Sequence, residues 1–238
     1  MTKSIINRGG NDTERLYLLD KEFNIPAGNK VVVKATDIPD IDMADLIARH
    51  KGRYYLVGLF CRPKQRVLDF PCGSGYAAEV LRPLGVMYEG LEFDPPTVEY
   101  ARRVYGNDAT QFNVGNLRHP SLGKERYDNI ACIEGLEHIE MEYQDGLIAA
   151  LKDALKPGSV LVVSSPENPT GSSGKSTHNK FHLGELTRAD FLALLHRHFE
   201  PRDVELVTYK AHLSTHIFVT CFYGICHKQV GEDILPLE

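Results

Sequence analysis

From Arg66 onward, short runs of apolar residues alternate with segments whose apolar positions recur at helical spacing. The runs are rich in Val, Ile, Leu, Tyr and Phe, which is typical of strands. The predicted strands cover residues 66–70, 86–93, 109–116, 127–134 and 159–167. The predicted helices cover residues 75–84, 95–106, 143–158 and 187–199. Because strands that alternate with helices form βα units, the pattern predicts a mostly parallel sheet.

Two further β-rich segments, residues 202–210 and 214–226, follow the last predicted helix. No helical segment separates them, so they should pair in antiparallel fashion. The predicted fold class is therefore α/β. It consists of a doubly wound, mostly parallel, seven-stranded sheet with a C-terminal antiparallel hairpin, and it is Rossmann-like.

The first 60 residues differ from the rest of the chain. They show no sustained period, and Pro26 and Pro39 interrupt them. Only residues 42–60 suggest helix, as one or two segments. We expect residues 1–60 to form an N-terminal cap that folds over a site on a main domain of residues 61–238.

Composition places the chain among globular proteins, with 42% hydrophobic and 25% charged residues. No apolar run approaches the roughly 18 residues that span a bilayer, and the polar start is unlike a signal peptide. We therefore expect a cytoplasmic protein without membrane insertion. The five cysteines form no CxxC pair and are expected to be reduced thiols. The net charge of −5 argues against a broad nucleic-acid footprint and favours a small-molecule or glycan partner.

The strongest candidate binding feature is the glycine-rich turn in VLDFPCGSGY, which connects the first strand to the first helix. Gly73 and Gly75 would let the backbone approach a ligand at the helix N-terminus. Such a turn ends many strands, so other residues must support it. Glu92 ends the second strand about 20 residues later, where a carboxylate can accept hydrogen bonds from the hydroxyl groups of a ribose. Asn116 closes the third strand, where an amide could hydrogen-bond the edge of an adenine.

Five segments together resemble the successive motifs of class I S-adenosylmethionine-dependent methyltransferases: DFPCGSG, GLEFDPPTVEYARRVYG, FNVGN, YDNIACIEGLEHIE and LKPGSVLVVSSPENP. The resemblance runs from Arg66 to about Phe199 and implies S-adenosylmethionine as the cofactor of residues 61–238. The donor-binding residues that it implies are Asp69, Gly73, Ser74 and Gly75 at the methionine part, Glu92 at the ribose, Phe93, Asn116 and Leu117 at the adenine, and Glu134. Two positions depart from the family pattern, because Pro71 replaces its first glycine and Asn116 stands where Asp is more common.

A nicotinamide-dependent dehydrogenase is the nearest alternative for the glycine turn. Its GxGxxG pattern is only partly matched here, because Ala78 stands where the third glycine is expected. The terminal hairpin and the LKPGS turn favour the methyltransferase.

The acceptor side must hold a nucleophile about 3 Å from the sulfonium methyl group and, for a hydroxyl, remove its proton. Glu137 and His138 follow the fourth strand, and His138 can take a proton near neutral pH. His182 lies on the loop after the fifth strand, which should cover the same opening. We therefore predict His138, Glu137 and His182 as catalytic residues. An ordinary surface or capping histidine is the alternative, since the chain has ten.

The ExxEH pattern with a later histidine also resembles two narrower groups, quinone-biosynthesis O-methyltransferases and small-RNA terminal 2′-O-methyltransferases. The second resemblance implies a divalent metal held by Glu134, Glu137, His138 and His182. The basic and aromatic signature of the RNA enzymes is weak here. The segments RYY, EYARRVYG and NKFHLGEL most resemble bacterial methyltransferases that modify surface polysaccharides and other sugars.

The predicted function is therefore O-methylation of a sugar, glycan or other small hydroxylated acceptor, with His138 as a metal-free general base. A metal-dependent RNA or quinone-precursor enzyme is the alternative. A donor-binding protein without catalysis is disfavoured because the acceptor-side residues are present. The sequence leaves the metal requirement, the acceptor and the oligomeric state open.

Overall fold

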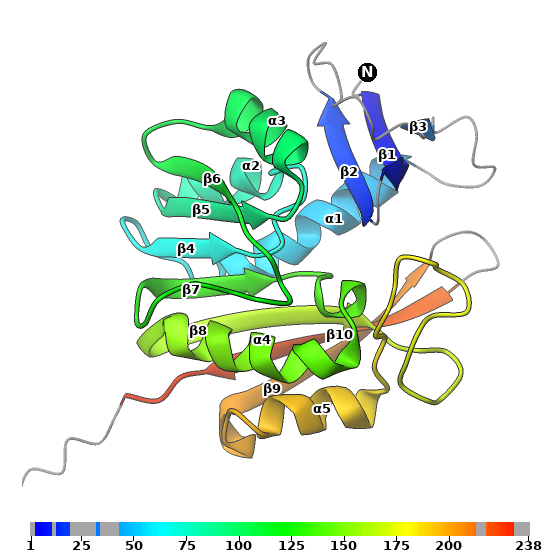
Figure 1. Cartoon of the computed structure of the whole chain (residues 1–238). Helices are drawn as coiled ribbons and strands as arrows, with labels where there is room; N and C mark the ends of the chain where they lie inside the picture. The colour runs from blue at the N-terminus through cyan, green and yellow to red at the C-terminus, as the bar shows by residue number, and fades with distance from the viewer. Residues whose placement is uncertain (1–2, 11–12, 20–31, 34–42, 213–217, 231–238) are drawn as a thin grey trace, which may run out of the picture.

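A computed structural model describes residues 3–10, 13–19, 32–33, 43–212 and 218–230 (Figure 1). Its centre is a seven-stranded sheet in the order β6-β5-β4-β7-β8-β10-β9. The strands are β4 (Arg66–Asp69), β5 (Met87–Glu92), β6 (Thr110–Val114), β7 (Tyr127–Cys132), β8 (Leu155–Pro166), β9 (Val204–His212) and β10 (Phe218–His227). The first five are parallel, and β10 pairs antiparallel with both β8 and β9. The predicted fold class is confirmed.

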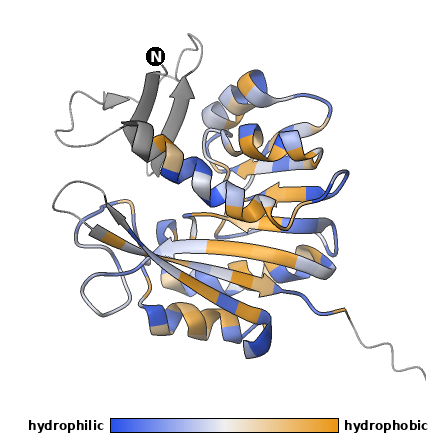
Figure 2. Cartoon of the chain, turned by 180° about the vertical axis from the view of Figure 1, so that it is seen from behind, coloured by the Kyte–Doolittle hydropathy of each residue, from blue (hydrophilic) through white to orange (hydrophobic). Residues whose placement is uncertain are grey.

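Helices cover both faces of this sheet (Figure 1). They are α1 (Met43–Gly58), α2 (Ala77–Leu81) with the 3₁₀ turn η2 (Arg82–Leu84), α3 (Pro95–Tyr105), the 3₁₀ turn η3 (Leu136–His138), α4 (Met141–Ala154), α5 (Arg188–His196) and the 3₁₀ turn η4 (Pro201–Asp203). Strand residues alternate between two cores, so Val67 packs with α1, α2 and α3, whereas Leu68 packs with α4 and α5. The central strands carry the longest apolar stretches (Figure 2).

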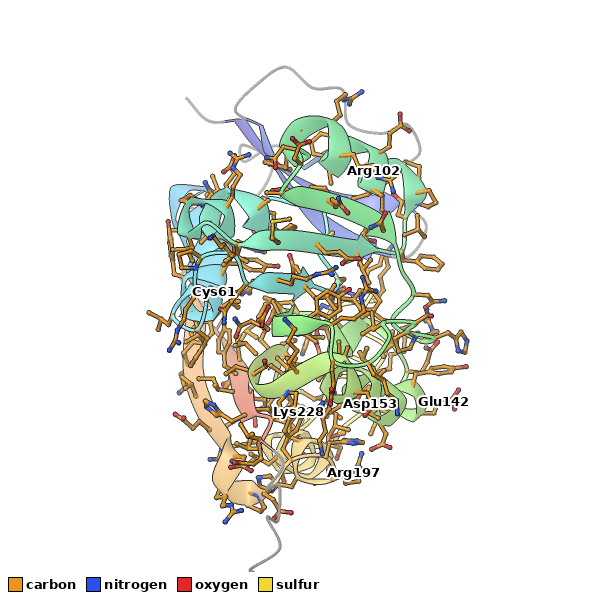
Figure 3. All side chains as sticks on the ribbon, turned by 90° about the vertical axis from the view of Figure 1, so that its left-hand side faces the viewer. Cys61, Arg102, Glu142, Asp153, Arg197 and Lys228 are labelled. Atoms are coloured by element: carbon orange, nitrogen blue, oxygen red, sulfur yellow. The ribbon has the colours of Figure 1, made fainter. Side chains whose placement is uncertain are left out.

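Local chemistry fixes the start and packing of α3. Pro95 occupies its first turn, and the Asp94 carboxylate accepts the Thr97 N–H at 3.0 Å. Farther along, the Arg102 side chain (labelled in Figure 3) donates from Nε to the Phe112 carbonyl at 2.6 Å. This contact joins α3 to β6 behind the glycine turn.

The end of α4 differs from the sequence prediction. The helix was expected to run to residue 158, but it ends at Ala154, and Leu155 already pairs with Tyr127 in the sheet. Pro157 has no N–H and disfavours helical geometry at the residue before it, and Leu155 is fully buried. Burial in the sheet therefore ends the helix before the Pro-Gly pair is reached.

The N-terminal segment contains strands that the sequence pattern did not predict. β1 (Lys3–Gly10), β2 (Thr13–Leu19) and β3 (Val32–Val33) form an antiparallel sheet in the order β2-β1-β3. Consecutive apolar residues, such as Leu16 to Leu19, hide the two-residue alternation of a strand. Residues 20–31 and 34–42 of the predicted cap lie outside the described residues, and its closure over a site stays a prediction.

Helix α1 belongs to the core of the main domain. Tyr54 and Val57 are buried in the same cluster as Val67 and Ala77. The predicted boundary at residue 60 places α1 in the cap. In the structure, however, α1 packs against residues of the main domain.

No helix in the described part of the chain is long and apolar enough to cross a membrane. All five cysteines are free thiols, and Cys61 (labelled in Figure 3) is the one that is only half-buried.

Candidate active site

The glycine turn between β4 and α2 lies at the carboxyl edge of the sheet. Gly75 has a φ of +87°, and a Cβ there would lie 2.7 Å from Phe112 and 2.9 Å from Ala101. A side chain at residue 75 would therefore be strained and would collide with the core. Gly73 has open space around its Cα, and Ser74 is fully buried. The turn thus presents bare backbone at Gly73 while Gly75 holds it against β6.

Asp69 lies beneath this turn and is fully buried. Its carboxylate accepts hydrogen bonds from Tyr54 at 3.2 Å and from Tyr88 at 2.6 Å. Burial raises the pKa of Asp69 to about 7, although the two tyrosine hydrogen bonds act in the opposite direction. Asp69 therefore ties α1 and β5 to the turn from below, and its direct contact with a donor stays a prediction.

Glu92 occupies the predicted position at the end of β5 and is buried. Its Oε1 accepts the backbone N–H groups of Phe93 at 2.9 Å and Asp94 at 3.2 Å, which fix the carboxylate. Phe93 itself is exposed. A carboxylate of fixed orientation therefore lies at the carboxyl edge of the sheet, and its contact with a ribose stays a prediction.

Asn116 and Leu117, two of the three predicted adenine residues, follow β6 at the same edge, where the Gly115 N–H donates to the Glu92 carbonyl at 3.0 Å. Leu117 is buried. The Asn116 side-chain oxygen accepts the Arg118 N–H at 2.9 Å in a local turn. The side-chain oxygen predicted for adenine is therefore engaged by the chain itself, and the adenine contact stays a prediction.

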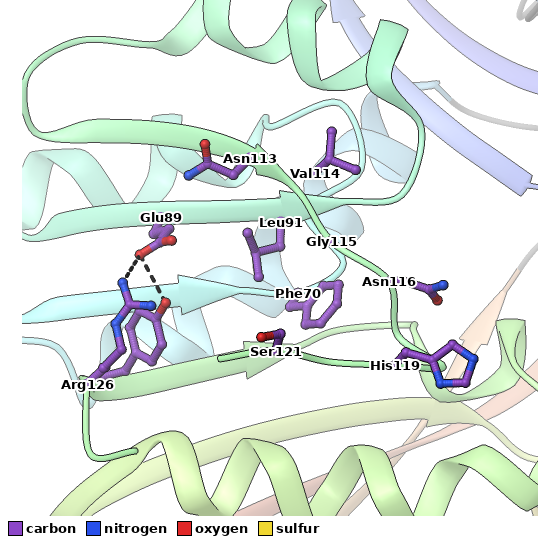
Figure 4. A pocket seen from close by; sticks show the side chains of 11 residues that line it. Phe70, Glu89, Leu91, Asn113, Val114, Gly115, Asn116, His119, Ser121 and Arg126 are labelled. Carbon is purple, nitrogen blue, oxygen red and sulfur yellow. Dashed lines mark hydrogen bonds and ion pairs between the residues drawn. The ribbon is translucent and has the colours of Figure 1, made fainter. Parts of the chain in front are cut away.

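A cavity of about 360 Å³ lies beside these residues, beneath the connection from β6 to β7 (Figure 4). Phe70 and Leu91 line it, and Glu89 at its far end accepts from Tyr127 Oη at 3.0 Å. Of the predicted donor residues, Asn116 alone lines the cavity, and no predicted catalytic residue does. The cavity therefore borders the predicted donor residues without enclosing them.

The predicted catalytic residues come together where the loop after β8 crosses η3. The Glu137 carbonyl accepts the N–H groups of Leu183 at 2.6 Å and Gly184 at 3.1 Å. His138 Nδ1 lies 3.2 Å from the Phe181 carbonyl. A carbonyl only accepts, so Nδ1 carries the proton and Nε2 of the neutral ring has the lone pair. The loop backbone therefore sets the tautomer of His138.

His182 stands perpendicular to His138, with ring centroids 5.0 Å apart. Its Nδ1 lies 2.6 Å from Glu185 Oε1, and its Nε2 lies 2.9 Å from Asn179 Nδ2. Asn179 Oδ1 accepts the Phe181 N–H at 3.0 Å, so the Asn179 amino group faces His182 and donates to Nε2. Asn179 and Glu185 were not predicted as functional residues, although both flank His182 in NKFHLGE.

Glu137 is buried beside the two imidazoles, and burial raises the pKa of its carboxyl well above the ordinary value, with Glu134 adding to the shift. Its Oε2 has no hydrogen-bond partner in the described structure, and neither has Oε2 of Glu185. Ligand atoms of Glu137, His138 and His182 lie within 4.8 Å of one another. These three residues could hold a divalent ion.

Glu134 does not join this cluster, which corrects the four-ligand set that the resemblance implied. Its Oε1 accepts the Ser164 hydroxyl at 2.8 Å, and its Oε2 accepts from Arg53 at 3.2 Å. Arg53 also contacts His50 Nδ1 at 3.3 Å. Burial lowers the pKa of His50 well below its ordinary value, so its ring is neutral. The sequence pattern missed Arg53 because nothing local shows that α1 faces the site.

A family model described as a methyltransferase domain matches residues 42–224. The chain belongs to this methyltransferase family. The match includes α1, in agreement with its place in the core of the methyltransferase domain.

Curated relatives agree with this assignment. A probable S-adenosylmethionine-dependent methyltransferase of Mycolicibacterium smegmatis is 30% identical over 148 residues, which cover 62% of this chain and 56% of the relative. A ubiquinone biosynthesis O-methyltransferase of Xanthomonas campestris pv. campestris is 29% identical over 114 residues, 47% of each protein. The chain thus spans about half the length of these relatives.

Solved structures share the fold. An S-adenosylmethionine-dependent methyltransferase of Methanosarcina mazei has a TM-score of 0.61 at 16% identity and covers 74% of this chain and 97% of its own. A Burkholderia thailandensis 1,6-didemethyltoxoflavin-N1-methyltransferase, solved with S-adenosylhomocysteine, has a TM-score of 0.59 at 14% identity. The match covers 87% of this chain and 99% of the Burkholderia chain. The domain therefore has the class I methyltransferase fold.

Proposed function

We propose that this protein transfers a methyl group from S-adenosylmethionine to a hydroxyl group of a small acceptor, with His138 as the general base. The main support is the hydrogen bond from His138 Nδ1–H to the Phe181 carbonyl, which leaves the lone pair on Nε2. In the reaction, the acceptor oxygen forms a bond to the methyl carbon and the carbon–sulfur bond breaks. Sulfur keeps the electron pair as S-adenosylhomocysteine, and the hydroxyl proton passes to Nε2. A sugar or glycan is the preferred acceptor, and a quinone precursor is the alternative.

The Arg53–Glu134 pair supports Glu134 as a donor-binding residue. The methionine part of the donor carries a carboxylate and an ammonium group, and a paired guanidinium and carboxylate offer the complementary charges. Arg53 Nε is buried without a hydrogen-bond partner in the described structure, so the guanidinium has donor capacity left for a carboxylate. With the donor carboxylate at Arg53 and the donor ammonium at Glu134, the pair would orient the donor above the glycine turn.

A labelled-donor screen tests the proposed function. The protein would be incubated with S-adenosylmethionine and with sugar nucleotides, glycans, quinone precursors and short RNAs in turn. We expect methyl transfer and formation of S-adenosylhomocysteine with a hydroxylated small molecule. Donor binding without turnover of any acceptor would support the non-catalytic alternative. The cytoplasmic location stays a prediction.

A metal-assisted version is the second candidate, favoured by the cluster of Glu137, His138 and His182 and by the unpartnered buried oxygens of Glu137 and Glu185. The donor set suits Mg²⁺ or Mn²⁺, and such an ion would lower the pKa of an acceptor hydroxyl. However, both ring nitrogens of His182 already have partners, so a bond from Nε2 to a metal requires displacement of the Asn179 amino group. The metal-free base remains the preferred version.

Chelation separates the two versions. For a metal-free base, EDTA should leave turnover unchanged. If turnover is lost to EDTA and recovered with Mg²⁺ or Mn²⁺, the metal version holds, and His182→Ala should then be as damaging as His138→Ala. Calorimetric titration of EDTA-treated protein with Mn²⁺ gives an independent readout, because a metal site would bind Mn²⁺ without acceptor.

A further inference from the structure

Gln144 is a buried polar side chain on the apolar face of α4, one turn before Leu147 and Ile148. Its Nε2 donates two hydrogen bonds, to the Leu136 carbonyl at 2.9 Å and to the Gly184 carbonyl at 2.7 Å. Both partners are carbonyl oxygens, which only accept, so the amino end of the amide must face them. The side chain of Gln144 therefore links η3 directly to the loop after β8.

Gly184 allows the loop to come this close to η3. A Cβ at residue 184 would lie 2.5 Å from the Ile139 carbonyl oxygen and 2.7 Å from Gln144 Nε2. A side chain there would push the loop away, because atoms in van der Waals contact do not approach so closely. The Gly184 N–H also donates to the Glu137 carbonyl at 3.1 Å. The glycine and the amide of Gln144 together set the distance between the loop and η3.

The predicted base lies within this junction. Leu136 stands two residues before His138 in η3, and Gly184 stands three residues after Phe181 in the loop. The Phe181 carbonyl accepts the proton on His138 Nδ1 at 3.2 Å, which is at the long end of the ordinary range. A small shift of the loop relative to η3 would break this hydrogen bond, and the ring would then be free to carry its proton on either nitrogen.

We infer that Gln144 is a positioning residue for His138, because it holds η3 against the loop and so keeps the proton of the neutral ring on Nδ1. The inference rests on the proposed function, in which His138 Nε2 takes the proton of the acceptor. His182 does not depend on Gln144 in this way, because its partners Asn179 and Glu185 belong to the same stretch of loop. Loss of the Gln144 amide should therefore affect one of the two histidines and spare the other.

Heteronuclear NMR of the imidazole nitrogens tests this inference, because a protonated and an unprotonated nitrogen of a neutral ring have different chemical shifts. The spectra are recorded in mildly alkaline buffer, where imidazole rings of ordinary pKa are neutral, and His138→Ala assigns the signals of His138. The wild type should carry the proton of His138 on Nδ1. Gln144→Met, which is similar in length but has no N–H, should give a mixture of the two tautomers, whereas His182 should keep its wild-type protonation. Gln111→Met, at an exposed position of β6, is the matched control.

Turnover gives a second readout, with an acceptor that the labelled-donor screen identifies. Gln144→Met should lower kcat by about tenfold or more and leave the KM for S-adenosylmethionine unchanged, because the base is misplaced while the donor site is kept. Gly184→Ala moves the loop from the opposite side of the junction and should reproduce both effects. It therefore tests the inference even if Gln144→Met does not fold. Calorimetry with S-adenosylhomocysteine shows which variants retain the donor site.

A Gln144→Met variant that binds S-adenosylhomocysteine and keeps the wild-type tautomer of His138 overturns the inference. A wild type that carries the proton of His138 on Nε2 overturns it as well, and so does a variant in which the protonation of both histidines changes, because the effect would then be a general loss of structure. If the tautomer of His138 alone changes but the wild type methylates no acceptor, or if kcat does not fall, the positioning by Gln144 holds and the proposed role of His138 as base fails.

Discussion

At the scale of single residues, His138 is the side chain on which the proposed chemistry depends. His138→Ala should lower the turnover rate by roughly 10²–10⁴-fold and leave donor affinity unchanged, because the variant loses only the proton acceptor. Steady-state rates and calorimetry with S-adenosylhomocysteine measure the two quantities. His196→Ala, on the exposed surface of α5, is the matched control. Full activity of His138→Ala would refute both the base and the metal versions.

Glu92 carries the corresponding prediction for the donor. Its carboxylate is held by two backbone N–H groups at the end of β5 and would accept the ribose hydroxyls. Glu92→Ala should therefore weaken S-adenosylmethionine binding by roughly 1–3 kcal/mol in a folded protein. Glu99→Ala on the exposed face of α3 should bind normally. If the two variants bind S-adenosylmethionine with equal affinity, Glu92 does not contact the donor.

At the scale of elements, Asp69 joins three of them, since it ends β4 and accepts hydrogen bonds from Tyr54 of α1 and Tyr88 of β5. Burial raises its pKa to about 7. Between its ordinary pKa, about 3.9, and pH 7, the folded protein keeps a proton that the unfolded chain has released. The free energy of unfolding should therefore fall as pH rises through this window.

Asp69→Asn removes this titration but keeps a side-chain oxygen that can accept a hydrogen bond from a tyrosine hydroxyl. Denaturant unfolding of wild type and variant at a series of pH values measures the difference in their free energies of unfolding. The advantage of the wild type over the variant should shrink as pH rises from 4 to 7 and then stay constant. A difference that does not change with pH would show that Asp69 has no raised pKa.

The loop after β8 and η3 form a second junction between elements. Backbone hydrogen bonds to Glu137 and the contact between Phe181 and His138 place two distant sequence segments in one site. The position of the predicted base thus depends on a loop that the strand and helix pattern leaves undescribed.

At the scale of the whole molecule, the predicted cap of residues 1–60 should close over the site. Ligand-bound protein should then exclude water there. Hydrogen exchange of the backbone amides of residues 1–60 should slow when S-adenosylhomocysteine is added. The backbone amides of α5 should exchange at the same rate with and without the ligand. A segment that is equally labile with and without ligand would be an appendage rather than a cap.

Much of this fold could be predicted because its signals are local. The strand and helix periods, the glycine turn and the positions of Glu92 and Asn116 are written in short stretches of chain, and the carboxyl ends of parallel strands must meet at one edge. The end of α4 and the strands β1 to β3 were missed for the complementary reason. Burial of Leu155 overrides the helical pattern, and consecutive apolar residues conceal the N-terminal strands.

Local sequence patterns were enough to predict the α/β class, the glycine turn and the clustering of Glu137, His138 and His182. The hydrogen-bond partners of these groups depend on the tertiary structure. Arg53 lies 81 positions before Glu134, and Phe181 lies 43 after His138. Contacts at such separations depend on how α1 and the loop after β8 cross the edge of the sheet. No local period encodes that path, because it follows from packing the two apolar cores.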